Sequence, residues 1–210
     1  MKIAHIISNK VWGGGEQYVY DLCSNLISDG NDVEIFTRPI PAIVGKVATL
    51  GVPIHDYSLK NILKLRDGIV HVHNFKDALK LAVAKKLTHS NIKIVVTRHL
   101  VRPAKTSRLY TWVYDNVEKI IFVSDLARKA FLSSQPKVDE AKLCVVRNSI
   151  KTNDNANSFA IDDIKASLPN DTTILMYHGR IAKEKGLNVL IDAVARLKDI
   201  PYHLFLVGAG

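Results

Sequence analysis

The chain has 210 residues, of which 47% are hydrophobic and 23% are charged, and this is the composition of an ordinary globular protein with one large or two smaller cores. No apolar run reaches the roughly 18 residues of a membrane span, and the first residues lack the regions of a signal peptide, so we expect a cytoplasmic protein. The formal net charge is +9, but the basic residues lack the interleaved aromatics of a base-stacking surface, which argues against nucleic-acid binding.

Residues 1–150 alternate short apolar segments with helical patterns. β-branched runs predict strands at 3–7, 32–37, 52–57, 68–72, 92–97, 119–123 and 143–146. Apolar residues at helical spacing predict helices at 16–27 and 40–50 and between the later strands, with Ser124 as an N-cap. This alternation indicates an α/β fold, a Rossmann-like parallel sheet with helices on both faces.

The pattern is interrupted once and then starts again. Residues 151–158 are polar and without periodicity, which is typical of a linker. A helix at 161–168, a strand at 173–177, a helix at 187–197 and a strand at 203–207 are predicted after it. We therefore expect a first domain at 1–150, a linker and leading helix at 151–170, and at 171–210 the first βαβ unit of a second, truncated Rossmann-like domain, because one such unit is too small to bury a core.

Two loops that follow predicted strands carry the features of an anion site. Gly13, Gly14 and Gly15 lie just before a helix, where residues without side chains allow positive φ and let backbone N–H groups approach a phosphate, although a plain tight turn also explains them. Arg180 and Lys185 lie in the loop before a later helix. Cations are unfavourable at a helix start, so an anion between them is expected, with a solvated loop as the alternative.

The cysteines and histidines do not predict a metal site. Cys23 and Cys144 lie in apolar segments without ligand spacing, so two buried thiols are expected rather than a zinc site or a disulfide. His71 and His73 alternate on one strand and share a face. A third ligand at suitable spacing is not evident in the sequence, and we predict no metal.

Several motifs occur in an order that resembles a known family. They are GGGE at 13–16, VTRH at 96–99, IIFVSD at 120–125, VVRNSI at 145–150, YHGRIAKEKGLNVLIDAVARL at 177–197 and LFLVGAG at 204–210. Together they resemble the GT-B glycosyltransferases of family 4, and the resemblance runs from Met1 to Gly210. It implies an acceptor-binding first domain and a second domain that binds a nucleotide sugar. The implied reaction transfers sugar from a UDP- or GDP-sugar to a glycan or lipid-linked acceptor with retention of configuration, without metal ion or cofactor.

The resemblance also implies roles for single residues. Gly14, with its neighbours Gly13 and Gly15, would present N–H groups to the donor diphosphate. Arg180 and Lys185 would neutralise the diphosphate as it leaves. His99 would lie near the acceptor and the transferred sugar, and Glu16 would either cap the helix or contact the acceptor. The family's pair of donor-binding glutamates would lie beyond Gly210, so we expect this chain to be an inactive fragment.

A basic stretch follows the strand that carries His99. Twelve Lys and Arg but only two Asp lie between Lys60 and Arg108. We expect Arg98, Arg102 and Lys105 on exposed backbone at the acceptor side, where they would meet a phosphorylated acceptor or an anionic membrane leaflet, with a merely solvated face as the alternative.

Two other functions compete with the transferase. A non-catalytic GT-B half-module for carbohydrate or membrane binding is the first. An NAD-dependent oxidoreductase is the second, and it would need a further glycine pattern and an acidic residue where Thr37 and Arg38 end the second strand.

Overall fold

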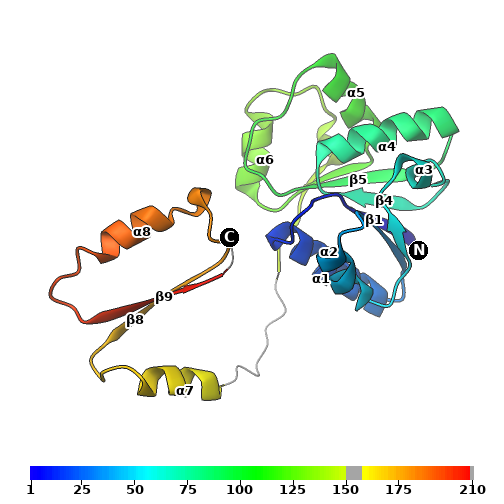
Figure 1. The fold of residues 1–210 in the computed structure, drawn as a ribbon. Coiled ribbons are helices and arrows are strands. Elements are labelled where there is room, and N and C mark those ends of the chain that lie inside the picture. The colour runs from blue at the N-terminus through cyan, green and yellow to red at the C-terminus, as the bar shows by residue number, and fades with distance from the viewer. Residues whose placement is uncertain (150–157, 209–210) are drawn as a thin grey trace. The chain divides into compact units, whose positions relative to one another are not determined.

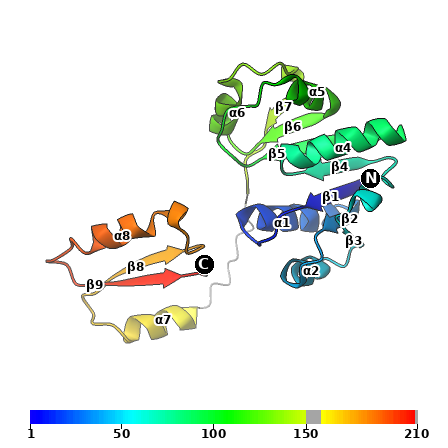
Figure 2. The same ribbon diagram turned by 45° about the horizontal axis from the view of Figure 1, so that its top comes forward.

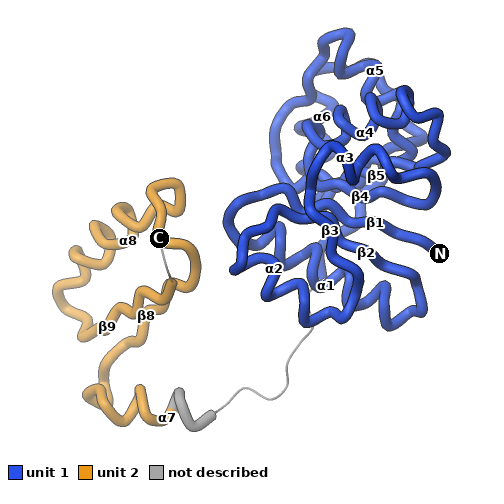
Figure 3. The backbone as a smooth tube through the Cα atoms, turned by 45° about the vertical axis from the view of Figure 1, so that its right-hand side comes forward, with its two compact units in different colours: residues 1–150 blue, residues 151–210 orange. Residues whose placement is uncertain are grey.

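The computed structural model describes residues 1–149 and 158–208 and divides the chain into two compact units (Figure 3). Unit 1 comprises residues 1–150 and unit 2 comprises residues 151–210. The predicted linker at 151–158 lies almost wholly outside the described residues.

Unit 1 (Figure 1) is built on a seven-stranded parallel sheet, whose order β3-β2-β1-β4-β5-β6-β7 can be followed in Figure 2. The strands are β1 (Lys2–Ile7), β2 (Asp32–Thr37), β3 (Ile54–Asp56), β4 (Ile69–Val72), β5 (Lys93–Arg98), β6 (Lys119–Phe122) and β7 (Leu143–Val145). The helices are α1 (Gly14–Ser28), α2 (Pro41–Ala48), α3 (Leu59–Ile62), α4 (Phe75–Thr88), α5 (Arg108–Asn116) and α6 (Asp125–Leu132). The predicted α/β fold class is confirmed, because every predicted strand of unit 1 is present and all seven pair in parallel.

The two faces of the sheet carry separate cores. On one face, α1 and α2 pack against β1 and β2, and their core includes Ile7, Cys23 and Ile35. On the other face, α4, α5 and α6 cover β4 to β7 (Figure 2), and their core includes Ile6 and Phe131. Helices therefore switch faces between β1 and β4, as they do where a doubly wound sheet reverses its order.

Local chemistry explains where several helices begin. Pro41 is the first residue of α2, where its missing N–H costs no helical hydrogen bond. Ser124 Oγ accepts from the N–H of Ala127 at 3.1 Å, which confirms the predicted N-cap of α6. Asn74 Oδ1 caps α4 in the same way, accepting from the N–H of Asp77 at 2.9 Å.

The structure corrects several local expectations. The short helix α3 and the 3₁₀ helices η1 (Glu140–Lys142) and η2 (Lys183–Lys185) were not predicted, because each is too short to show periodicity. Gly13 is extended, with φ −152°, and Gly14 and Gly15 begin α1, so these glycines do not serve a positive φ. Cys144 is only half-buried, because β7 is the last strand at the sheet edge, whereas Cys23 is fully buried.

Unit 2 contains α7 (Ser158–Ala166), β8 (Thr173–His178), η2, α8 (Leu187–Val194) and β9 (Tyr202–Val207). β8 and β9 form a two-stranded parallel sheet, in register from Thr173 with Tyr202 to His178 with Val207. This is one βαβ unit with several exposed apolar side chains, among them Met176 (62%) and Val189 (72%). Among the described residues of both units, no helix is both long and apolar enough to cross a bilayer.

Candidate functional site

A cavity of about 270 Å³ opens at the point where β1 and β4 lie side by side. Helices follow these strands onto opposite faces of the sheet, so the loops beyond their carboxyl ends diverge and leave a crevice. The polar side chains that line the cavity come from the loop after β1, from α1, from the loop after β4 and from the loop after β5: Ser8, Asn9, Glu16, His73, Asn74 and His99. Gly15 also lines it. Three of the predicted site residues, Gly15, Glu16 and His99, thus meet at one cavity.

The start of α1 forms one wall of this cavity. Glu16 is buried, and its carboxylate accepts from the N–H of Gly13 at 2.9 Å and from the side-chain amide of Asn9. Glu16 therefore caps the helix that it belongs to. A Cβ added at Gly14 or Gly15 would have no described atom within 4 Å, so protein packing does not require these glycines, and their backbone is open to a ligand.

His99 reaches the cavity from the end of β5. Its Nε2 lies 3.3 Å from Nδ1 of His73, and Tyr18 of α1 lies edge-on to its ring at a centroid distance of 5.0 Å. Burial lowers the pKa of His99, and the nearby Glu16 carboxylate partly offsets this effect. A neutral imidazole at this place can donate one hydrogen bond and accept another.

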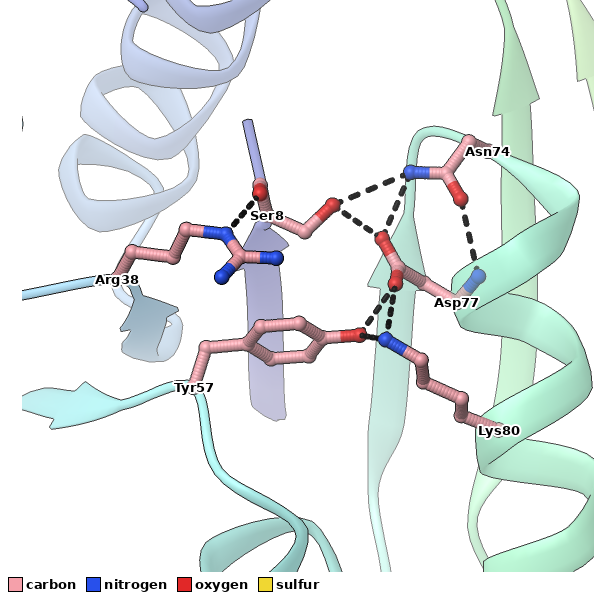
Figure 4. A network of polar contacts seen from close by, with 6 residues as sticks. All are labelled: Ser8, Arg38, Tyr57, Asn74, Asp77 and Lys80. Atoms are coloured by element: carbon pink, nitrogen blue, oxygen red, sulfur yellow. Dashed lines mark hydrogen bonds and ion pairs between the residues drawn. The ribbon is translucent and has the colours of Figure 1, made fainter. Parts of the chain in front are cut away.

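A buried carboxylate holds two of the cavity residues in place (Figure 4). Asp77 accepts from the Ser8 hydroxyl at 2.5 Å, from the Asn74 amide at 2.7 Å and from the Tyr57 hydroxyl, and Lys80 Nζ lies 3.6 Å from it. This cluster joins the ends of β1 and β3 to the first turn of α4. Burial and the hydrogen bond to Asp77 raise the pKa of Tyr57, which stays a neutral donor.

The basic stretch divides into residues used within the fold and residues left exposed. Arg98 Nη2 donates to the carbonyls of Arg102 and Pro103 at 2.5 and 3.1 Å, and its guanidinium lies 5.2 Å from the ring centroid of Phe131. Arg98 is therefore half-buried and holds its own loop, and the expectation that it is exposed is wrong. Arg102 and Lys105 are exposed, and Lys105 donates to Tyr110 Oη at 3.0 Å.

The two predicted cations of the later loop lie in unit 2. Arg180 pairs with the carboxylate of Glu184 on the solvent-exposed surface. Lys185 ends η2 and is exposed. An exposed ion pair contributes at most about 1 kcal/mol, so the Glu184 partner is easily exchanged for a stronger anion.

Sequence reasoning missed Ser8, which directly follows β1, and Asn74, which lies two residues beyond the end of β4. The rule that ligands bind beyond the carboxyl ends of parallel strands would have selected them. It also missed that His5 of β1 joins His71 and His73, with one ring nitrogen of each within 4.8 Å of the others. Spacing along the chain gives no sign of this third histidine, because β1 and β4 are neighbours only in the folded sheet.

Comparisons with known proteins identify the family. The family described as Glycosyltransferase Family 4 matches residues 12–154, which is most of the chain. The chain belongs to glycosyltransferase family 4. No curated protein is similar enough in sequence to count as a match.

Solved structures show the same fold at low sequence identity. HepE from Anabaena, solved in complex with UDP-glucose, is 14% identical with a TM-score of 0.75, and the match covers 100% of this chain and 61% of HepE. The lipopolysaccharide outer core galactosyltransferase WaaB is also 14% identical, with a TM-score of 0.61 and the same two coverages. MurG from Acinetobacter baumannii is 12% identical, with a TM-score of 0.52 over 98% of this chain and 58% of MurG. The family 4 chain thus spans about three fifths of the length of these structures.

Proposed function

We propose that this family 4 chain is the acceptor-binding domain, together with the first part of the donor-binding domain, of a glycosyltransferase. The enzyme transfers sugar from a UDP- or GDP-sugar to a glycan or lipid-linked acceptor with retention of configuration, and a metal ion takes no part in this transfer. The observation that carries the proposal is the meeting of Gly15, Glu16 and His99 at one cavity, at the switch point of a sheet in this family.

Each side of the proposed site has a defined task. The open backbone at Gly14 and Gly15 is suited to the donor diphosphate, because N–H groups at a helix start attract anions. His99 contacts the transferred sugar or the acceptor hydroxyl from the cavity. Arg180 and Lys185 of unit 2 neutralise the leaving diphosphate, whose charge grows in the transition state.

We also propose that the donor domain continues beyond this chain and that residues 1–210 alone turn over little or no donor. The coverage of 61% of HepE and the exposed apolar residues of unit 2 support this. The assay compares residues 1–210 with the product of the longer reading frame, using a panel of UDP- and GDP-sugars. Equal turnover by the two would contradict it.

A glycine substitution tests the diphosphate contact without loss of stability. Gly14→Ala adds a methyl group to the first residue of α1, where it meets no described atom, so folding should be unharmed. In the longer enzyme, turnover should fall about tenfold or more, because the methyl group holds the diphosphate away from the backbone. Gly45→Ala is the matched control, since Gly45 is also helical and equally open. Equal turnover by both variants would remove Gly14 from the donor site.

We also propose that one surface of unit 1 binds an anionic membrane, which presents a lipid-linked acceptor. The segment from Leu100 to Leu109 exposes apolar Leu100 (57%), Val101 (51%) and Leu109 (50%) beside exposed Arg102 and Lys105. Apolar side chains that insert among headgroups, with cations contributing about 1 kcal/mol each near the surface, form a membrane-binding combination.

Cosedimentation with vesicles tests this contact. Binding to anionic vesicles should exceed binding to neutral ones and should weaken with salt, and the paired change Arg102→Glu and Lys105→Glu should abolish it. The reversal Lys137→Glu, at an exposed lysine outside the segment, is the control and should retain binding. The membrane contact is contradicted if the double variant binds anionic vesicles as well as Lys137→Glu does. It is also contradicted if the unchanged protein binds neither anionic nor neutral vesicles.

A further inference from the structure

Three imidazoles converge where β1 and β4 pair, between the sheet and α1. His5 is fully buried and lies opposite His71 in the register of the two strands, and His73 follows at the end of β4. Ring centroids lie 4.9 Å apart for His5 and His71 and 4.7 Å apart for His71 and His73. One ring nitrogen from each of the three lies within 4.8 Å of the other two.

Several nitrogens of this histidine cluster lack a partner. Among the described residues, neither ring nitrogen of His5 has a hydrogen-bond partner, nor has Nε2 of His73. Buried polar atoms are nearly always paired, so unpaired ones indicate a bound water or ion. A neutral imidazole has a free lone pair, which is the form that binds metals.

One nitrogen of His71 and one of His73 have a hydrogen-bond partner. Nε2 of His71 lies 2.7 Å from the hydroxyl of buried Thr97, and Nδ1 of His73 lies 3.3 Å from Nε2 of His99. A hydrogen bond at one ring nitrogen fixes the tautomer of a histidine and leaves its other nitrogen free for a metal. Two of the three rings can therefore offer Nδ1 of His71 and Nε2 of His73 as lone-pair donors.

We propose that His5, His71 and His73 are the ligands of one transition-metal ion, and that this ion is Zn²⁺. A set of three imidazoles without a carboxylate suits Zn²⁺, and does not suit Mg²⁺ or Ca²⁺, which prefer oxygen. Zinc–nitrogen bonds of about 2.0–2.1 Å place ligand nitrogens roughly 3.3 Å apart, so the ion must draw together three nitrogens that lie within 4.8 Å of one another. His73 also lines the cavity, which gives the ion a route of entry. The site goes beyond the proposed transferase, whose reaction does not use it.

Metal binding by the untagged chain, stripped with a chelator, tests the site. Zn²⁺ titrated by calorimetry should bind at one ion per chain, and Co²⁺ should give the intense visible absorption of a four-coordinate site. His5→Leu and His73→Leu should each weaken Zn²⁺ binding by more than about 100-fold, because losing even an outer partner of a ligand costs about 10- to 100-fold. The control is His89→Asn at an exposed left-handed C-cap that asparagine tolerates, and it should bind as the wild type does.

His5→Leu removes two unpaired buried nitrogens, whereas His73→Leu removes one unpaired nitrogen and the partner of His99 Nε2, and tryptophan fluorescence checks that both variants fold. A measurement on the wild type does not depend on them: Zn²⁺ should shift the ring ¹⁵N resonances of the three cluster histidines and leave His89 unchanged. The proposal is overturned if Zn²⁺ shows no saturable binding at one ion per chain. It is equally overturned if the bound ion shifts only exposed histidines, or if folded His5→Leu and His73→Leu bind as tightly as the wild type.

Discussion

Replacing Asp77 by alanine should destabilise unit 1 strongly, because this side chain is 3% exposed and accepts three hydrogen bonds. Removing it leaves the donors of Ser8, Tyr57 and Asn74 without their acceptor in a buried place. Hydrogen bonds to a charged group contribute about 1.5–3 kcal/mol each, and breaking a buried charged cluster costs about 3–5 kcal/mol. We expect a loss of about 3–5 kcal/mol for Asp77→Ala.

Two further variants separate the causes of this loss. Asp77→Asn keeps the size and one acceptor, so it should lose only about 1–2 kcal/mol. Lys80 is 51% exposed on its side chain, so Lys80→Gln should lose at most about 1 kcal/mol. If Lys80→Gln costs as much as Asp77→Ala, the ion pair dominates and the hydrogen-bond reasoning is wrong.

Urea unfolding followed by tryptophan fluorescence measures these losses in unit 1 alone, because both tryptophans, Trp12 and Trp112, lie there. With a slope of about 2 kcal/mol per molar urea, the midpoint for Asp77→Ala should fall by roughly 1.5–2.5 M. A loss below about 1 kcal/mol would refute the reasoning, since buried donors would then have found other partners.

Two further predictions concern pH and the core. The folded pKa values of His5, His71 and His73 lie below the ordinary value of 6.5. The unfolded chain therefore binds more protons below pH 6.5, and stability should fall as the pH falls from 6.5 towards 4, by about 1.4 kcal/mol per pH unit for each ring that stays neutral. Urea midpoints at pH 7, 6 and 5 measure this fall in stability. His71→Leu should make the midpoint depend less on pH, and equal midpoints at the three pH values for the unchanged protein would contradict the prediction. Phe131→Ala should cost about 3–5 kcal/mol in the same assay, since the ring is fully buried against Tyr114, and a loss below about 1 kcal/mol would show that the core refills the space.

The sequence was sufficient for the features that depend on neighbours along the chain. Strands of Val and Ile with helical patterns between them predicted the sheet, and the same pattern predicted that His99 follows the end of a strand. Ser124 was recognised as a cap because a cap is a property of four consecutive residues. These are local signals, and the structure retains them.

Features that depend on contacts between distant segments could not be predicted from the sequence. β1 pairs with both β2 and β4, and only this pairing places His5 opposite His71. Arg98 reads as a free cation, but its guanidinium lies 5.2 Å from the ring centroid of Phe131, a contact that forms only when α6 packs on the sheet. Such contacts join residues far apart in the chain, and no periodicity reports them.

Some cavity residues also hold the fold together, and this decides which substitutions can report on function. Asn74 lines the cavity, caps α4 through the N–H of Asp77 and donates to the Asp77 carboxylate. A loss of activity in Asn74→Ala would therefore reflect the lost cap and the lost hydrogen bond to Asp77 as much as any substrate contact. Gly14 has no such second task, since a methyl group there meets no described atom. A change in turnover at Gly14, with unchanged urea midpoint, is consequently the observation that can assign the start of α1 to substrate binding.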